Sequence, residues 1–296
     1  ASPAHTGLTS LPEAPDGFER AFGADGQLYK PEPPAGTLAL PLPTSDDALG
    51  FESGESGAHE ELSALASALA AGDREAIEAH LDVEAALAYL ALNTLLVNLD
   101  SYVGVGHNYY LFVNQGRVTI LPWDLNEAFG NFTCSCDREG LIGLLIEEPS
   151  CAPLAERPLL QALLDEPEWN TRYRELLTQM LDGELAEAAM QTRIDALAAL
   201  IRPYVEADPT KLFSTAQFEQ ALSDDVSDPH QTIIGLMAFV RERGVAVRAQ
   251  LAGTTPAAGD GSGSCELGGT QPKPCGDGVC DDYERSHPGL CPLDCD

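Results

Sequence analysis

The chain has 296 residues, 44% of them hydrophobic, which is enough for one large domain or two smaller ones. Its 47 acidic and 16 basic side chains give a formal net charge of −31. Such a surface repels phosphate backbones and anionic lipid, so the charge argues against nucleic-acid binding and against a membrane-surface role. The sequence has no apolar run long enough for a transmembrane helix, and we expect no membrane span.

Residues 1–50 carry little regular pattern and are rich in Pro, Gly and Ala. We expect an irregular N-terminal segment whose one candidate strand is Thr37–Leu42. Lys30 is the only lysine before residue 98, which makes it the candidate residue for contacting a nucleotide phosphate. A solvated or structural lysine is the alternative interpretation.

Three helices are predicted between residues 59 and 98. The first covers His59–Ala71, and Asp73 is placed to cap a second helix that ends at His80. Asp82 begins a long apolar helix that leads directly to Asp100. Because a carboxylate is disfavoured at the C-terminal end of a helix, we expect a cation close to Asp100.

Two runs of alternating polarity follow, at 109–113 and 117–121, and the turn signal Asn114-Gln115-Gly116 separates them. This pattern predicts a β-hairpin. A hairpin returns its ends to one place, so Asp100, Asn108 and Asp124 are expected to converge. One carboxylate that acts as a base, with two oxygen ligands for a hard cation, suits phosphoryl transfer. A glycosidase-like carboxylate pair is an alternative.

The segments NLDSYVGVGHNYYLF (98–112) and ILPWDLNEAFG (120–130) resemble the CotH kinase-like family, an atypical protein kinase group named after spore coat protein H. The resemblance extends from about Gly17 to Leu251. It implies a kinase-like C-terminal lobe in which Asp100 is the catalytic aspartate and Asn108 and Asp124 are the metal ligands. It also implies ATP and Mg²⁺ or Mn²⁺ as cofactors, and a hydroxyl group of a protein substrate as acceptor.

Three features depart from that pattern. Asp100 and Asn108 are eight positions apart, whereas the corresponding residues of ordinary protein kinases are about five apart. Asn126 replaces a second acid often present in the family. The sequence shows no Gly-rich loop and no strand-borne lysine with a partner glutamate. We therefore expect a fragment or an incomplete kinase, in which residues 1–50 are the remnant of a nucleotide lobe. A catalytically inactive surface, adhesion or coat-assembly protein with the same fold is the alternative.

The segment Asn131–Leu154 occupies the position of a kinase activation loop and carries three cysteines. We expect a disulfide from Cys151 to Cys134 or Cys136, with the remaining cysteine paired to Cys265. A zinc site is the alternative, but a fourth ligand is not evident.

Residues 158–251 are predicted to be helical throughout, which completes a kinase-like domain over 51–251. The fold class is α+β and mostly helical. Pro167 marks one helix start, and Ser214 with Gln217 forms a predicted capping box. The arginines of the last helix (Arg241, Arg243 and Arg248) are expected to form a solvated face.

Residues 252–264 have the composition of a flexible linker, and residues 265–296 contain five cysteines. This last segment resembles the cysteine-rich repeats of secreted bacterial surface proteins, and we expect a small disulfide-rich module. Dense cysteines indicate an oxidising compartment, so we expect an exported protein, either extracellular, on the cell surface or periplasmic. Ca²⁺ binding by acidic residues of the module is a further expectation.

Overall fold

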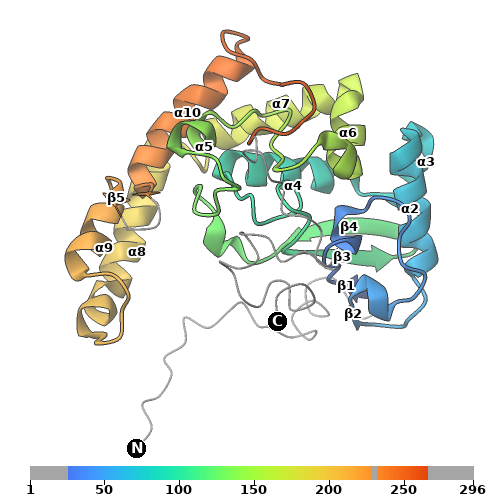
Figure 1. The fold of residues 1–296 in the computed structure, drawn as a ribbon, viewed down its shortest axis with the longest axis horizontal. Coiled ribbons are helices and arrows are strands. Elements are labelled where there is room, and N and C mark those ends of the chain that lie inside the picture. The colour runs from blue at the N-terminus through green and yellow to red at the C-terminus, as the bar shows by residue number, and fades with distance from the viewer. Residues whose placement is uncertain (1–25, 228–231, 266–296) are drawn as a thin grey trace, which may run out of the picture.

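The computed structural model describes residues 26–227 and 232–265, which form an α+β fold (Figure 1). The predicted α+β class is therefore confirmed. The strands are β1 (Gln27–Tyr29), β2 (Phe51–Ser53), β3 (Tyr109–Asn114), β4 (Arg117–Pro122), β5 (Val226–Ser227) and β6 (Thr232–Ile233). The α-helices are α2 (His59–Ala71), α3 (Arg74–His80), α4 (Val83–Leu96), α5 (Arg138–Gly143), α6 (Pro158–Asp165), α7 (Pro167–Asp182), α8 (Glu187–Ala207), α9 (Thr215–Ala221) and α10 (Leu236–Leu251).

The larger sheet is antiparallel and has the strand order β2-β1-β3-β4. Strands β3 and β4 form the predicted hairpin, with Tyr109 opposite Pro122 and Asn114 opposite Arg117. Gln115 and Gly116 have φ values of 52° and 77°, the left-handed conformations that a two-residue hairpin turn requires. The predicted hairpin is present, and each strand is one residue longer than its alternating run, because Asn114 belongs to β3 and Pro122 to β4.

The N-terminal segment is more regular than predicted. Strand β1 pairs with both β2 and β3, so residues expected to be irregular form an inner strand of the sheet. The candidate strand Thr37–Leu42 is absent: Thr37 is the last residue of a 3₁₀ helix, η1 (Ala35–Thr37), and residues 38–42 form neither strand nor helix. Residues 1–25 lie outside the described residues.

Helices α3 and α4 begin where the sequence supplies a capping carboxylate. Asp73 accepts a hydrogen bond from the backbone N–H of Ala76, and Asp82 accepts one from that of Ala85. These bonds satisfy amides that the first helical turn leaves unpaired. Helix α4 is buried along most of its length and packs against α7 and β4, which places it at the centre of the core.

Arg243 in α10 was expected to be solvated but is only 2% exposed. Its guanidinium donates to the carbonyl oxygens of Thr94, Ile142 and Leu144. These carbonyls belong to α4 and to the region around α5, so a helix-face pattern within α10 alone did not reveal them. Arg243 thus joins three distant segments.

The region 158–251 is not helical throughout. Strands β5 and β6 form a two-stranded antiparallel sheet immediately before α10. Helices α8 and α9 form an arm at one edge of the molecule (Figure 1). The predicted capping box of α9 is present between Ser214 and Gln217.

Two disulfides connect Cys134 with Cys151 and Cys136 with Cys265. They agree with one of the two predicted pairings, and these cysteines are not arranged as a zinc site. The predicted linker packs against residues 145–154. Glu148, only 1% exposed, accepts the backbone N–H groups of Gly259 and Gly263. The described helices include none that is long and apolar enough to cross a bilayer.

Candidate functional site

The loop that carries Asp100 begins where α4 ends. Val97 has a φ of 47°, a left-handed conformation that stops the helix. The carbonyl of Ser101 then accepts backbone N–H groups of residues 105, 106 and 107, which closes the loop into a compact turn. A Cβ at Gly104 would overlap the backbone of Leu99, so this position requires glycine.

Asp100 and Asn108 are in direct contact. The side-chain nitrogen of Asn108 donates to Oδ2 of Asp100 over 2.7 Å, and Nδ1 of His107 lies 3.2 Å from Oδ1. Asn108 is 5% exposed and has a φ of 49°. Asparagine tolerates this left-handed conformation better than most residues. It turns the chain from the loop into β3.

The contact network continues to Lys30. Nε2 of His107 lies 2.6 Å from Glu32, and Nζ of Lys30 lies 2.9 Å from the other carboxylate oxygen of Glu32. Lys30 immediately follows β1. Lys30 thus has a glutamate partner, but it lies just outside the strand, and Glu32 lies in the same loop and not on a helix, so the expectation of no strand-borne lysine with a partner glutamate is not overturned.

The acidic neighbours stabilise the charged forms of both bases. The hydrogen bond to Asp100 is the largest influence on His107, and together with the charge of Glu32 it raises the pKa of the imidazole despite partial burial. Burial acts to lower the pKa of the Lys30 ammonium, but the hydrogen bond and charge of Glu32 outweigh it and raise the pKa. A protonated His107 can donate to both carboxylates at once.

Asp124 follows β4 by two residues, at the same end of the hairpin as Asn108. Its φ is 48°, and its side chain is exposed, without a hydrogen-bond or ion-pair partner among the described residues. Beside it, the Trp123 ring packs edge-on against Tyr110 with centroids 5.1 Å apart. Asn108 therefore lies just before β3 and Asp124 just after β4, at the same end of the hairpin.

The described residues contain no cluster of three or more His, Cys, Asp or Glu side chains placed to share one metal. The predicted ligands are one carboxylate, Asp124, and one amide, Asn108. Because the amide nitrogen of Asn108 is bound to Asp100, its oxygen is the atom left for a ligand role. Mg²⁺ is commonly held by one or two protein oxygens together with water and substrate phosphates, and this donor set fits that chemistry.

Two residues that the sequence analysis did not select belong to the surroundings of the site. Glu32 links Lys30 to His107, and its position two residues after Lys30 was the one local signal. Arg157, 4% exposed, donates to the Gly104 carbonyl from two guanidinium nitrogens, at 3.2 and 2.6 Å. Its partner is 53 positions away, so nothing local indicated that role.

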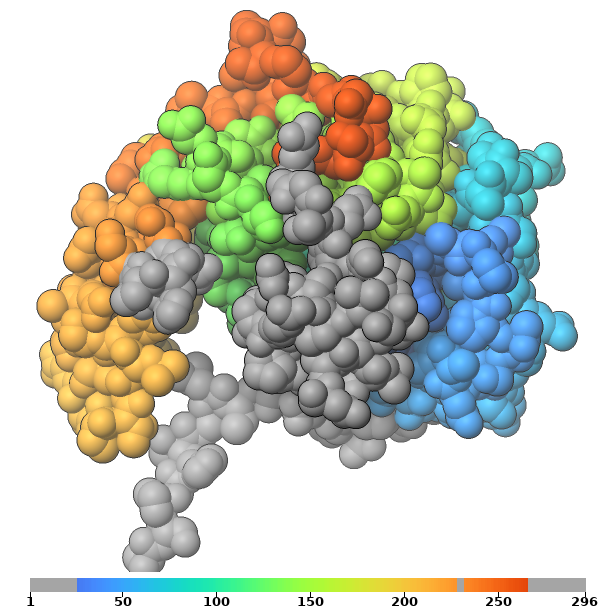
Figure 2. All heavy atoms as spheres, in the orientation of Figure 1, coloured from blue at the N-terminus to red at the C-terminus, as the bar shows by residue number. Residues whose placement is uncertain are grey.

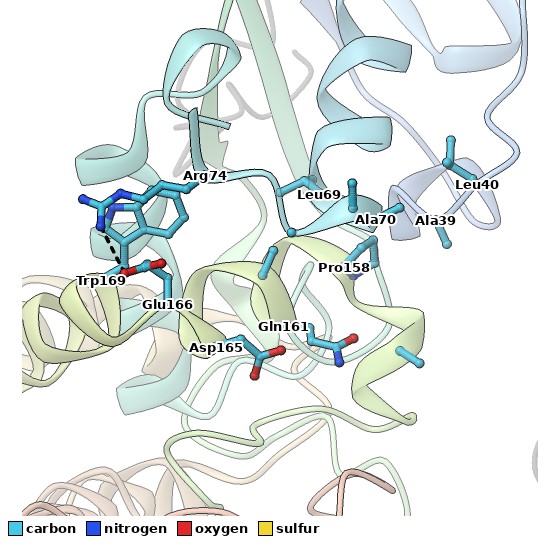
Figure 3. Close-up of a pocket in the computed structure, with 14 residues that line it drawn as sticks. Ala39, Leu40, Leu69, Ala70, Arg74, Pro158, Gln161, Asp165, Glu166 and Trp169 are labelled. Carbon is cyan, nitrogen blue, oxygen red and sulfur yellow. Dashed lines mark hydrogen bonds and ion pairs between the residues drawn. The ribbon is translucent and has the colours of Figure 1, made fainter. Parts of the chain in front are cut away.

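Two hollows lie away from Asp100. One, of about 490 Å³, lies between the end of α2 and α6 and is lined by Gln161 and Asp165 and by the ion pair of Arg74 with Glu166 (Figure 3). The other, of about 390 Å³, is mostly apolar and lies between α9 and residues 126–131, just beyond Asp124.

Comparisons with known proteins place the chain in a family. The family described as CotH kinase protein matches residues 15–247, which include the hairpin and every candidate site residue. The chain is also 28% identical over 143 residues to the inner spore coat protein H of Bacillus subtilis (strain 168). That alignment covers 48% of this chain and 36% of the relative, so the chain spans about a third of that protein. The match over most of its length shows that the chain belongs to the CotH kinase protein family.

Proposed function

We propose that this chain is an exported atypical protein kinase, or part of one, that transfers a phosphoryl group to a hydroxyl of a protein substrate. The observation that carries the proposal is the contact between Asp100 and Asn108 at the hairpin end from which Asp124 also emerges. Family membership supports the same reaction class. The two disulfides support export, because such bonds persist in oxidising compartments.

Each residue has a role that its contacts permit. Asp100 would accept the proton of the acceptor hydroxyl. Its two oxygens each receive one contact from the protein, and a carboxylate oxygen can accept more than one hydrogen bond. Asn108 and Asp124 would hold Mg²⁺ or Mn²⁺, and Lys30 would contact a phosphate. ATP with its metal would supply the phosphoryl group and neutralise its charge.

The name of the Bacillus subtilis relative motivates a second candidate function. That protein is named as an inner spore coat component, so this chain would act as a non-catalytic coat or surface protein with the same fold. Asn126 in place of a second acid fits this alternative, since it lowers the negative charge beside Asp124. A non-catalytic protein should tolerate Asp124→Ala without loss of function.

Calorimetric titration of ATP with Mg²⁺ or Mn²⁺ separates the two candidates. We expect metal-dependent ATP binding by the chain and its loss in Asp124→Ala. Asp165→Ala is the matched control, because it removes an exposed carboxylate from the hollow beside α6 and should leave binding intact. Binding that does not need the metal, or that survives Asp124→Ala, would contradict the proposed site.

A further inference from the structure

An uncharged hollow lies beside the turn that carries Asp124. It has a volume of about 390 Å³ and lies between α9 and residues 126–131. Helix α9 belongs to the gold-coloured arm, which stands at the edge of the molecule (Figure 2). The described residues that line the hollow include no charged side chain, and three of them are the aromatic residues Phe129, Phe213 and Phe218. On a chain with a net charge of −31, such a surface suits an uncharged, apolar group.

A backbone hydrogen bond places one wall of the hollow beside the candidate residues. The N–H group of Phe129 donates to the carbonyl of Leu96 over 2.7 Å, and Leu96 precedes Asp100 by four residues. Asn126, which also lines the hollow, follows Asp124 by two residues. Because each residue spans at most about 3.6 Å, the Cα atoms of Asn126 and Asp124 lie within about 7 Å of each other. The hollow therefore adjoins the candidate metal ligand and the segment that leads to the candidate base.

Contacts outside the hollow fix its walls. The Phe129 ring packs edge-on against Phe239, with centroids 5.4 Å apart. Asp225, immediately before β5, accepts a hydrogen bond from Arg138 and another from the backbone N–H of Gly235, immediately before α10. Strand β5 and the start of α10 both contribute residues to the lining. The hollow is thus formed before a ligand arrives, which lowers the entropy cost of binding.

We propose that the hollow binds an apolar side chain of the substrate protein, a few residues from the acceptor hydroxyl. The inference rests on the proposed phosphoryl transfer, which brings a polypeptide to Asp100. An extended polypeptide advances about 3.3 Å per residue, so a side chain two to four residues from the hydroxyl lies about 7 to 13 Å away from it. A cavity of roughly 150 Å³ accommodates benzene, so this hollow has room for a phenylalanine or leucine side chain. The substrate is therefore a hydroxyl residue with an apolar residue close by in its sequence.

Two amide side chains in the lining favour a polypeptide over a nucleobase. The nitrogen of Asn131 donates to Glu127, and the oxygen of Gln217 accepts from Ser214. The oxygen of Asn131 and the nitrogen of Gln217 have no partner among the described residues. An amide that reads an adenine edge needs its nitrogen and its oxygen together. The main chain of a peptide offers separate N–H and C=O groups, which single amide atoms can bind.

A peptide library with a fixed central serine and randomised flanks, panned against the full chain, tests the hollow without requiring catalysis. We expect one flanking position to be enriched in Phe, Leu or Tyr. Phe213→Glu should weaken binding of a selected peptide about tenfold or more, because it places a charge in an apolar hollow. Leu212→Glu is the matched control, since this neighbouring residue is 94% exposed and does not line the hollow. No enrichment, or equal weakening by both variants, would overturn the inference.

A second pair of variants fills the hollow and removes no contact. Ala221→Trp places an indole ring in the hollow, and Ala216→Trp places one on the exposed face of the same helix. We expect only Ala221→Trp to abolish peptide binding, and both variants to bind ATP with Mg²⁺ as the parent does. Loss of ATP binding in Ala221→Trp alone would assign the hollow to the nucleotide and overturn the inference.

The two proposals fail in different measurements. Panning is done without nucleotide as well as with ATP and Mg²⁺, so peptide selection is measured whether or not ATP binds. A parent chain that selects apolar peptides but binds no ATP would refute the phosphoryl transfer and support the hollow as a peptide site. A parent chain that binds ATP with its metal but selects no apolar residue would refute only the hollow.

Discussion

Asn108 holds Asp100 by a hydrogen bond of 2.7 Å between its amide nitrogen and Oδ2 of the carboxylate. The two residues lie at opposite ends of one loop, so the bond closes that loop and orients Asp100. Because the amide nitrogen of Asn108 donates to Asp100, only the amide oxygen of Asn108 is available to bind a metal ion. A single contact therefore connects the candidate base to the candidate metal ligand.

Asn108→Asp is expected to destabilise the protein by about 2 kcal/mol near neutral pH. The substitution keeps the size of the side chain but replaces the donor with a second carboxylate beside Asp100. Urea unfolding should show the loss, and stability should recover at acid pH or with added Mg²⁺. Asn126→Asp, an exposed control with the same chemical change, should alter stability by less than about 0.5 kcal/mol. Equal effects of the two variants would contradict the role of this contact.

Arg157→Lys should loosen the Asp100 loop, because an ammonium lacks the planar fork that now donates twice to the Gly104 carbonyl. We expect a loss of about 2 kcal/mol and faster hydrogen exchange at the amides of residues 105–107. Arg243→Lys is the matched control, since Arg243 is also buried and also donates to backbone carbonyls. Faster exchange in both variants to the same degree would indicate a merely global effect.

The two disulfides should contribute unequally to stability. Their cysteines are separated by 17 and 129 residues. Chain-entropy arguments give about 3 kcal/mol for the shorter loop and about 5 kcal/mol for the longer one. Serine replacements of Cys136 with Cys265 should therefore lower the unfolding midpoint more than replacements of Cys134 with Cys151. The reverse order would show that local packing and not loop length dominates.

Arg138 should support stability in a pH-dependent manner. Its guanidinium lies 2.5 Å from Asp225 and 2.7 Å from Glu242. Burial acts to raise the pKa of Asp225, but the hydrogen bond from Arg138 outweighs it and lowers the pKa. The hydrogen bond from Arg138 is also the largest influence on Glu242, whose pKa is lowered. Carboxyl groups with a depressed folded-state pKa stabilise the protein above their unfolded pKa and lose that contribution as pH falls.

We therefore expect Arg138→Gln to be less stable than the parent by about 1 kcal/mol at neutral pH, a small value because these groups are partly exposed. The difference should shrink as pH falls from about 5 towards about 2. Urea unfolding across this range checks it. Arg117→Gln is the control, since its ion pair with Asp82 is 4.0 Å long, and its stability difference should stay near zero. A pH-independent difference would exclude this origin.

Features set by neighbouring residues could be predicted from the sequence. The caps at Asp73 and Asp82 depend on residues three positions away. The turn of the hairpin depends on Gln115 and Gly116, and the capping box at Ser214 is equally local. The contact of Asp100 with Asn108 was predictable because the hairpin and its preceding loop are one continuous segment.

Features set by distant partners could not be predicted. Glu32 reaches His107 only because β1 is inserted between β2 and β3, and a three-residue strand gives too short a pattern to detect. Strands β5 and β6 have two residues each, and their alternating pattern is likewise too short to detect in the sequence. Arg243 resembled a solvated residue since its three carbonyl partners come from other segments. The Ca²⁺ expectation concerns residues 266–296, which lie outside the described residues.

The register of the β3–β4 hairpin restricts where the chain can change length during evolution. Residues added at the Gln115–Gly116 turn would extend the hairpin without shifting Asn108 relative to Asp124, because Tyr109 would remain opposite Pro122. A single residue inserted into one strand alone would slip the register and turn the side chains of that strand to the other face of the sheet. Insertions at the turn are thus the ones that natural variants or engineered loops can carry.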